Sequence, residues 1–114
     1  MNVEMNKAIA ALIENIKNDY YLSTSRNNTK ELSEVNISMI NDFNEGLGCE
    51  IGRKYAKITS RGSVWGFVVI GADEKFKVGD ILKAASWASP TRNKARGNIL
   101  AGQYKIQWTG PNYL

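Results

Sequence analysis

One short stretch concentrates the cations of this chain, since Arg92, Lys94 and Arg96 stand within five residues. Asn93 adds a polar side chain between the first two. On a helical turn after Pro90, Arg92 and Arg96 would share a face, and the free N–H groups of that turn could meet an anion. The pattern predicts contact with phosphate, and the alternative is a solvated connection between two strands.

Aromatic residues could provide stacking surfaces beside a second set of cations. This set consists of Arg53, Lys54, Lys57 and Arg61. Aromatic rings interleaved with cations on a β-surface are typical of proteins that bind single-stranded nucleic acid. We expect Trp87 to be exposed and Trp65 to lie in the core, while both alternatives stay open for Trp108. No named nucleic-acid motif supports this prediction.

Histidine is absent, and this excludes much of the chemistry that enzymes use. The usual general base near neutral pH is missing, and so is the commonest metal ligand. With a single cysteine, Cys49, the chain cannot form a Ser/His/Asp site, a Cys/His site or a structural zinc site. We expect no enzymatic activity, no metal and no cofactor, with Cys49 as a small buried residue. The least favoured alternative is an enzyme that uses Asp80 or Glu50 with Arg96.

Charge is divided unevenly along the 114 residues. Residues 1–50 carry four Lys/Arg against eight Asp/Glu, whereas residues 51–114 carry eleven against three. We interpret residues 1–114 as a single domain with an acidic, mainly helical half (1–50) and a basic, mainly β half (51–114). The basic half predicts a partner rich in phosphate or in acidic side chains. The lone cysteine, the absence of a signal-peptide pattern and the absence of a long apolar run favour the cytoplasm and no membrane contact.

Hydrophobic periodicity predicts the elements that position these residues. A helical stripe spans residues 4–20, with apolar members Met5, Ile9, Leu12, Ile13, Ile16 and Tyr20. A second helix is expected over 38–47, whereas 31–37 fits either helix or strand. Alternating or β-branched segments follow at 55–59, 64–70 and 104–108. The predicted fold is α+β, with N-terminal helices packed on a curved antiparallel β-sheet or a small, partly open β-barrel.

The basic half also resembles a known family. The residues that carry the resemblance are SVWGF at 63–67, the run FKVGDILKAASWASPTRNKARGNI at 76–99, and WTGP at 108–111. They are similar to a family of small bacteriophage-encoded proteins of unknown function, over roughly residues 40–114. The resemblance implies a phage origin, expression in the host cytoplasm and an accessory role of the host-takeover type. No activity is established for that family, so it assigns no catalytic or binding residue.

Together these observations predict a non-enzymatic phage accessory protein whose basic β half binds nucleic acid or an acidic surface of a host protein. The residues expected to form the interface are Trp87, Arg92, Asn93, Lys94, Arg96, Arg53, Lys54, Lys57 and Arg61. The alternative is a homo-oligomer, a self-associating structural or assembly protein in which the acidic half of one copy meets the basic half of another.

Overall fold

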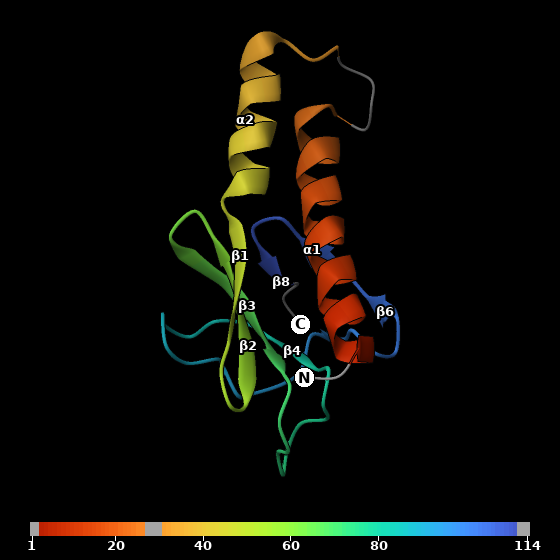
Figure 1. Cartoon of the computed structure of the whole chain (residues 1–114), viewed down its shortest axis with the longest axis vertical. Helices are drawn as coiled ribbons and strands as arrows, with labels where there is room; N and C mark the ends of the chain where they lie inside the picture. Colours follow the sequence, from red (N-terminus) through yellow and green to blue (C-terminus); the bar gives the residue numbers. More distant parts are fainter. Residues whose placement is uncertain (1–2, 27–30, 112–114) are drawn as a thin grey trace.

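The computed structural model describes residues 3–26 and 31–111. Its elements are α1 (Val3–Thr24), α2 (Glu34–Glu45), β1 (Leu47–Ile51), β2 (Tyr55–Ser60), β3 (Ser63–Val69), β4 (Ile81–Leu82), β5 (Gly97–Asn98), β6 (Gln103–Tyr104), β7 (Ile106–Gln107) and β8 (Gly110–Pro111) (Figure 1). The first four strands form an antiparallel sheet in the order β1-β2-β3-β4, and β5–β6 and β7–β8 pair separately. The α+β prediction is confirmed. The sheet is not closed into a barrel.

Helix α1 presents a continuous apolar stripe to the rest of the molecule. Its buried members are Met5, Ile9, Leu12, Ile16 and Tyr20. Spacings of three and four residues place them on one side of the helix, as the periodicity predicted. Ile13, expected in the same stripe, is half-buried at its edge.

Helix α2 begins earlier than the sequence pattern suggested. Ser33 caps it: its Oγ accepts a hydrogen bond from the Asn36 N–H (3.1 Å), and the Asn36 side chain accepts one from the Ser33 N–H (3.3 Å). This reciprocal capping box makes residues from Glu34 onward helical and decides the open segment 31–37 in favour of a helix in its second part. The predicted end at residue 47 is wrong, because Leu47 already belongs to β1.

A β-bulge in β3 allows side chains of this strand to pack in two separate apolar clusters, one on each face of the sheet. Ile58 pairs with Gly66 and Thr59 with Val64, so Trp65 is the extra residue. An extra residue interrupts the alternation of side chains. Trp65 consequently packs with the helices, as expected for a core residue, and its Nε1 donates to the Gln107 carbonyl (2.8 Å).

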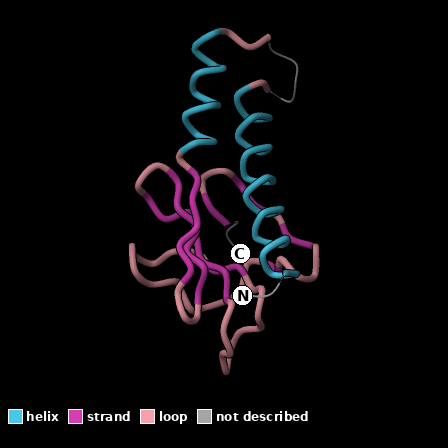
Figure 2. Tube along the Cα trace, viewed as in Figure 1, coloured by secondary structure: helices cyan, strands magenta, loops and turns pink. Residues whose placement is uncertain are grey.

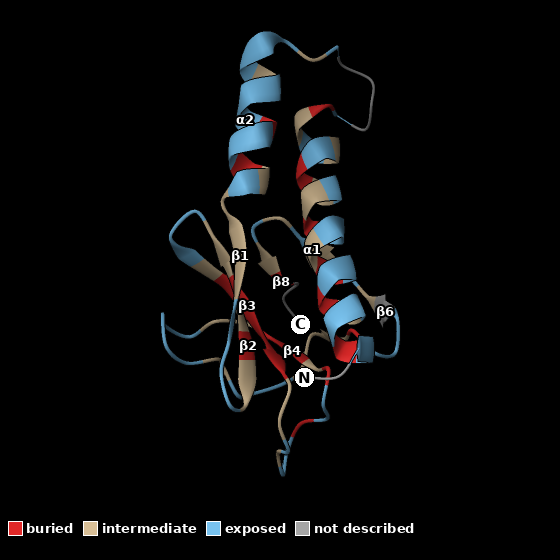
Figure 3. Cartoon of the chain, viewed as in Figure 1, coloured by how far each residue is buried: buried red, intermediate tan, exposed pale blue. Residues whose placement is uncertain are grey.

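The sheet has an apolar cluster on each face. Its buried residues in β2 and β3 are red in Figure 3. On the helix-facing side, the sheet contributes Ala56, Ile58, Trp65, Val68 and Ile81 to the core of α1 and α2. On the other side, a smaller cluster is formed by Phe67, Val69, Phe76 and Leu82. Phe76, from the connection between β3 and β4, and Ala84 and Ala95, from the connection between β4 and β5, pack in this cluster and cover that side. Both connections are largely loops, drawn pink in Figure 2. The expected interface residues therefore lie largely on, or beside, irregular structure.

The C-terminal segment forms two short hairpins rather than the single strand expected over 104–108. The chain turns after β7, and the turn is attached to α1 because the Trp108 N–H donates to the Asp19 carboxylate (2.8 Å). The Trp108 ring meets Tyr20 edge-on at 5.0 Å between centroids, and Tyr20 stacks on Phe43 at 4.1 Å. Trp108 thus joins the edge of the helical core.

Candidate functional site

The structure divides the nine expected interface residues among separate places. Lys54 and Arg92 bind one buried carboxylate, and Asn93 and Arg96 hold a loop together. Trp87 covers Lys57 on the outer side of the sheet, and Arg53 and Lys94 are exposed nearby in the chain. Arg61 lies at the opposite end of β2. They do not form one continuous basic surface.

Asp73 is the residue that sequence reasoning missed. Its side chain has no solvent-exposed surface, and Oδ2 lies 2.7 Å from Lys54 Nζ and 3.0 Å from the Arg92 guanidinium. Oδ1 accepts hydrogen bonds from the backbone N–H groups of Lys75 (2.7 Å) and Phe76 (3.1 Å). The ion pair with Lys54, and then the bond from the Lys75 N–H, hold the pKa of Asp73 well below its ordinary value. We call Asp73, Lys54 and Arg92 the Asp73 cluster.

The Asp73 cluster makes Arg92 a structural residue. Besides its ion pair, the guanidinium donates to the Tyr55 hydroxyl and lies 5.1 Å from the centre of the Phe76 ring. The carboxylate of Asp73 raises the pKa of Arg92 above its ordinary value. A cation neutralised in this way adds little to the attraction of phosphate, so the prediction that Arg92 and Lys54 are available for an anion is not supported by their contacts.

The helical turn expected after Pro90 does not form. Pro90 pairs with Ala84 across a β-bridge, and the Thr91 N–H donates to the Lys83 carbonyl (2.6 Å). The Arg96 N–H then donates to the Ile81 carbonyl (2.8 Å), only two residues back along the neighbouring segment. Residues 92–95 must therefore bow outward as a loop.

Side chains inside this loop stabilise it. The Arg96 guanidinium donates to Asn93 Oδ1 (3.0 Å), and Arg96 Nε donates to the Lys94 carbonyl (3.1 Å). Arg92 and Arg96 consequently serve different partners instead of sharing a helical face. Lys94, which is exposed, is the cation of this stretch whose side chain points to no partner within the described residues.

Trp87 is exposed, as predicted. It stands in a tight loop that the N–H groups of Ala85 (2.9 Å) and Ser86 (3.1 Å) close by donating to the Ser89 carbonyl. Its side chain remains 53% exposed, and its ring lies 4.3 Å from Lys57 Nζ. The Lys57 ammonium is also 3.7 Å from Glu50. An indole that contacts a cation on one face and keeps about half of its surface exposed is available for a second planar group.

A shallow hollow lies beside Lys57 and reaches Ala88, the residue that follows Trp87. It encloses about 230 Å³, and its walls include Arg53, Tyr55, Lys57 and Ala88. Because Lys54 and Arg92 both bind Asp73, the segments that carry Arg53 and Lys94 lie next to each other. We call Trp87, Lys57, Arg53 and Lys94 the Trp87 face.

The carboxylates considered for catalysis have structural partners. Asp80 Oδ2 accepts the Lys77 N–H (2.9 Å) and Oδ1 accepts the Asn98 amide (2.9 Å), which gives Asp80 the turn-capping role typical of a Gly-Asp turn. Glu50 is exposed beside Lys57. Cys49 is half-buried, less than expected, and burial raises the pKa of its thiol, which makes the nucleophilic thiolate scarce.

The part of the chain that the structure describes holds neither a cluster of metal ligands nor a membrane-spanning helix. Within residues 3–26 and 31–111, no three Cys, Asp or Glu side chains gather in an arrangement that could hold a metal ion. Neither helix in that part of the chain has the length and apolar character needed to cross a bilayer.

The comparison with family models identifies the chain. The model of a family of unknown function, DUF7717, matches residues 1–113. The protein belongs to this family. The match includes the helical half, which the resemblance over roughly residues 40–114 had left out. No curated protein and no solved structure matches the chain.

Proposed function

We propose that this DUF7717 protein binds single-stranded nucleic acid through the Trp87 face, without catalysing a reaction. The observation that carries the proposal is the exposure of Trp87 on a hydrogen-bonded loop, with its ring 4.3 Å from Lys57 Nζ. A large indole held in a fixed place and open to solvent offers a stacking surface. Because the loop already orders the side chain, binding a base costs little further conformational entropy.

The charges around Trp87 suit a nucleic-acid backbone. Lys57 lies beneath the ring, and Arg53 and Lys94 are exposed on adjacent segments. A base would stack on the open face of the indole while neighbouring phosphates approach Arg53 and Lys94. Such binding depends on the backbone and on stacking, and it requires no base-specific hydrogen bonds.

The resemblance to phage-encoded proteins also implies where the proposed binding takes place. An accessory protein made in the host cytoplasm would meet nucleic acid there, and it would also meet acidic host proteins. The two partners are distinguished by capture from host lysate with and without nuclease. Loss of the captured partner after nuclease treatment supports nucleic acid, whereas an acidic protein retained after the treatment contradicts it.

The direct test compares Trp87→Ala with the wild-type protein in binding a labelled poly-dT oligonucleotide, followed by fluorescence anisotropy. If the ring stacks on a base, the variant should lose about 1–3 kcal/mol of binding free energy. Tyr21→Ala is the matched control, because Tyr21 is also an exposed aromatic residue (37%) but lies on helix α1, outside the Trp87 face. A wild-type protein that fails to bind the oligonucleotide at low salt would refute the proposal.

A specific observation favours self-association as a second candidate function. Helix α2 contains three acidic residues, Glu34, Asp42 and Glu45, and no Lys or Arg. It also exposes Val35 (68%), Ile37 (48%) and Met39 (44%). Exposed apolar side chains on an acidic helix could contact the basic half of another copy. Sedimentation at low and high salt tests this: a dimer lost in Val35→Glu supports the candidate, and a monomer at every concentration refutes it.

A further inference from the structure

A second candidate site lies at the other end of β2. A cleft of about 530 Å³ opens between the β2–β3 turn and the β7–β8 turn. The residues that line it include Ser60, Arg61, Ser63, Trp65, Trp108 and Thr109. This volume lies in the range of small-molecule sites, and the cleft shares no residue with the Trp87 face.

Arg61 supplies the charge of the cleft and is held by its surroundings. Its backbone has φ 48°, in the left-handed region that few residues other than glycine adopt, and Gly62 continues the turn at φ 81°. Its N–H donates to the Gly46 carbonyl (2.9 Å), and a Cβ at position 46 would lie 2.5 Å from Arg61 Cγ. Gly46 is therefore required for the close approach of the arginine stem.

No carboxylate neutralises Arg61 among the described residues. The guanidinium instead lies 5.3 Å from the centre of the Phe43 ring. At the other end of β2, by contrast, Lys54 is bound by Asp73. An arginine in an unusual backbone conformation, fixed by packing and without a counter-ion in residues 3–26 and 31–111, is a reason to infer a binding role.

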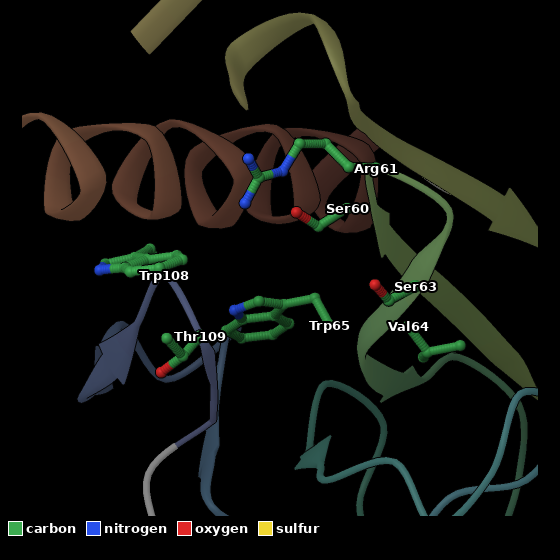
Figure 4. Close-up of a pocket in the computed structure, with 7 residues that line it drawn as sticks. All are labelled: Ser60, Arg61, Ser63, Val64, Trp65, Trp108 and Thr109. Carbon is green, nitrogen blue, oxygen red and sulfur yellow. The ribbon is translucent and has the colours of Figure 1, made fainter. Parts of the chain in front are cut away.

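The remaining walls suit a flat ring and an anion (Figure 4). Arg61 and the hydroxyl group of Ser60 border the space on one side, and the indoles of Trp65 and Trp108 border it on the other. Trp65 is buried at 3% exposure and forms a fixed wall. Trp108 is half-buried, so part of its ring is accessible.

We propose that this cleft binds a nucleoside monophosphate group, with the base against Trp108 and the phosphate on Arg61. A guanidinium binds phosphate oxygens through two parallel hydrogen bonds, and the hydroxyls of Ser60 and Ser63 can donate to the same group. A base stacks on an indole whatever its sequence. The same chemistry is presented by a free mononucleotide and by the 5′-phosphorylated end of a strand.

The test uses the indole N–H signals of the full-length protein in ¹⁵N–¹H NMR spectra. The chain has three tryptophans, Trp65, Trp87 and Trp108, and each gives one signal. In a titration with AMP, the signals of Trp65 and Trp108 should shift at lower AMP concentrations than the signal of Trp87. Adenosine or inorganic phosphate alone should bind more weakly than AMP.

Two variants and one control test the role of Arg61. Arg61→Gln should weaken AMP binding about tenfold or more, because a charged hydrogen-bond donor is lost, and Arg61→Lys should retain part of the affinity. Lys7→Gln is the control, since Lys7 is an exposed cation on helix α1 that belongs neither to this cleft nor to the Trp87 face. Backbone signals of helix α1 that keep their wild-type positions in each variant show that the fold is intact.

Clear outcomes would overturn the proposal. AMP shifts of equal size in wild type and Arg61→Gln, shifts confined to Trp87, or no shift at all would each refute it. To separate the two sources of the ligand, 5′-phosphorylated and unphosphorylated oligonucleotides are compared; a preference for the phosphorylated strand over AMP indicates a strand end. AMP binding by Trp87→Ala should equal that of wild type, so this proposal and the function proposed for the Trp87 face can fail independently.

Discussion

The two faces of the four-stranded sheet are covered by different kinds of structure. One face packs against α1 and α2 through apolar side chains such as Leu12, Ile16 and Phe43, all fully buried. The other face is covered by loops that the Asp73 cluster and a small apolar group attach to the sheet. Burial of apolar area is insensitive to pH and salt, whereas an ion-paired carboxylate is sensitive to both.

This contrast explains why cationic side chains that are close in sequence make different contacts. The loop-covered face needs polar anchors because its segments lack regular backbone hydrogen bonding, and Arg92 and Arg96 serve as anchors. Among the expected interface cations, Arg53 and Lys94 remain exposed, and Arg53 lines the same hollow as Ala88, the residue after Trp87. A count of basic residues therefore overstates the charge available to a partner.

The largest effect is expected on the helix-covered face. Leu12→Ala removes a fully buried side chain from the shared core and should reduce the free energy of unfolding by about 2–5 kcal/mol. Denaturant melts at pH 7 and at acidic pH should give the same loss, because Leu12 belongs to a cluster of buried hydrophobic side chains. A loss below about 0.5 kcal/mol, the size typical of surface substitutions, would mean that α1 does not pack as described.

The loop-covered face should depend on pH through Asp73. Since the folded-state pKa of this carboxyl is depressed, its contribution to stability is present above the ordinary carboxyl pKa of about 3.9 and is lost as the pH falls below that value. Asp73→Asn should therefore be less stable than wild type at pH 7. The difference between the two should shrink as the pH falls from about 4, measured by thermal melts across pH.

Two neighbouring cations provide a matched pair. Arg92→Gln removes an ion pair from the Asp73 cluster and should lower the melting temperature, whereas Lys94→Gln should change stability by no more than about 0.5 kcal/mol. The same reasoning predicts that replacing Arg92, Lys94 and Arg96 together damages the loop as well as any binding. Equal melting temperatures for the two single variants would contradict the role given to Asp73.

The smallest effect is expected from changing the exposed cations, which should alter nucleic-acid binding and leave stability unchanged. Arg53→Gln combined with Lys94→Gln should leave the fold intact and flatten the dependence of log affinity for single-stranded DNA on log salt by about 1.4, or about 0.7 for each lost phosphate contact. Trp87→Ala should weaken binding without changing that slope. A salt slope unchanged by the double variant would remove Arg53 and Lys94 from the Trp87 face.

Much of the fold could be predicted from local patterns. The stripe from Met5 to Tyr20 has a period close to that of a helix, and Ser63–Val69 is rich in β-branched and aromatic residues, so each segment indicates its own structure. The same holds for exposed Trp87, flanked by small and polar residues. The start of α2 could have been found from Ser33 and Asn36, whose spacing is that of a capping box.

The candidate site depended on contacts between distant residues. Asp73 and Arg92 are separated by 19 positions, and no local pattern shows that they meet. The sequence contains only a weak indication for Asp73. An Asp side chain can accept a hydrogen bond from the N–H two residues later, here that of Lys75, and so form an Asx-turn. Similarly, nothing in the sequence brings the turn at Arg61 to the turn at Trp108, which the helical core and the β3 bulge position.

The sequence by itself determined the periodic elements, the α+β class and the uneven charge, because each is a property of neighbouring residues. The tertiary structure decided which cations are neutralised and which remain available, because ion pairing depends on distances between segments far apart in the chain. Arg92 and Lys94 are two positions apart in the sequence, yet one is bound to a buried carboxylate and the other is exposed. That difference arises where the 92–95 loop bows away from β4 and carries Arg92 to Asp73.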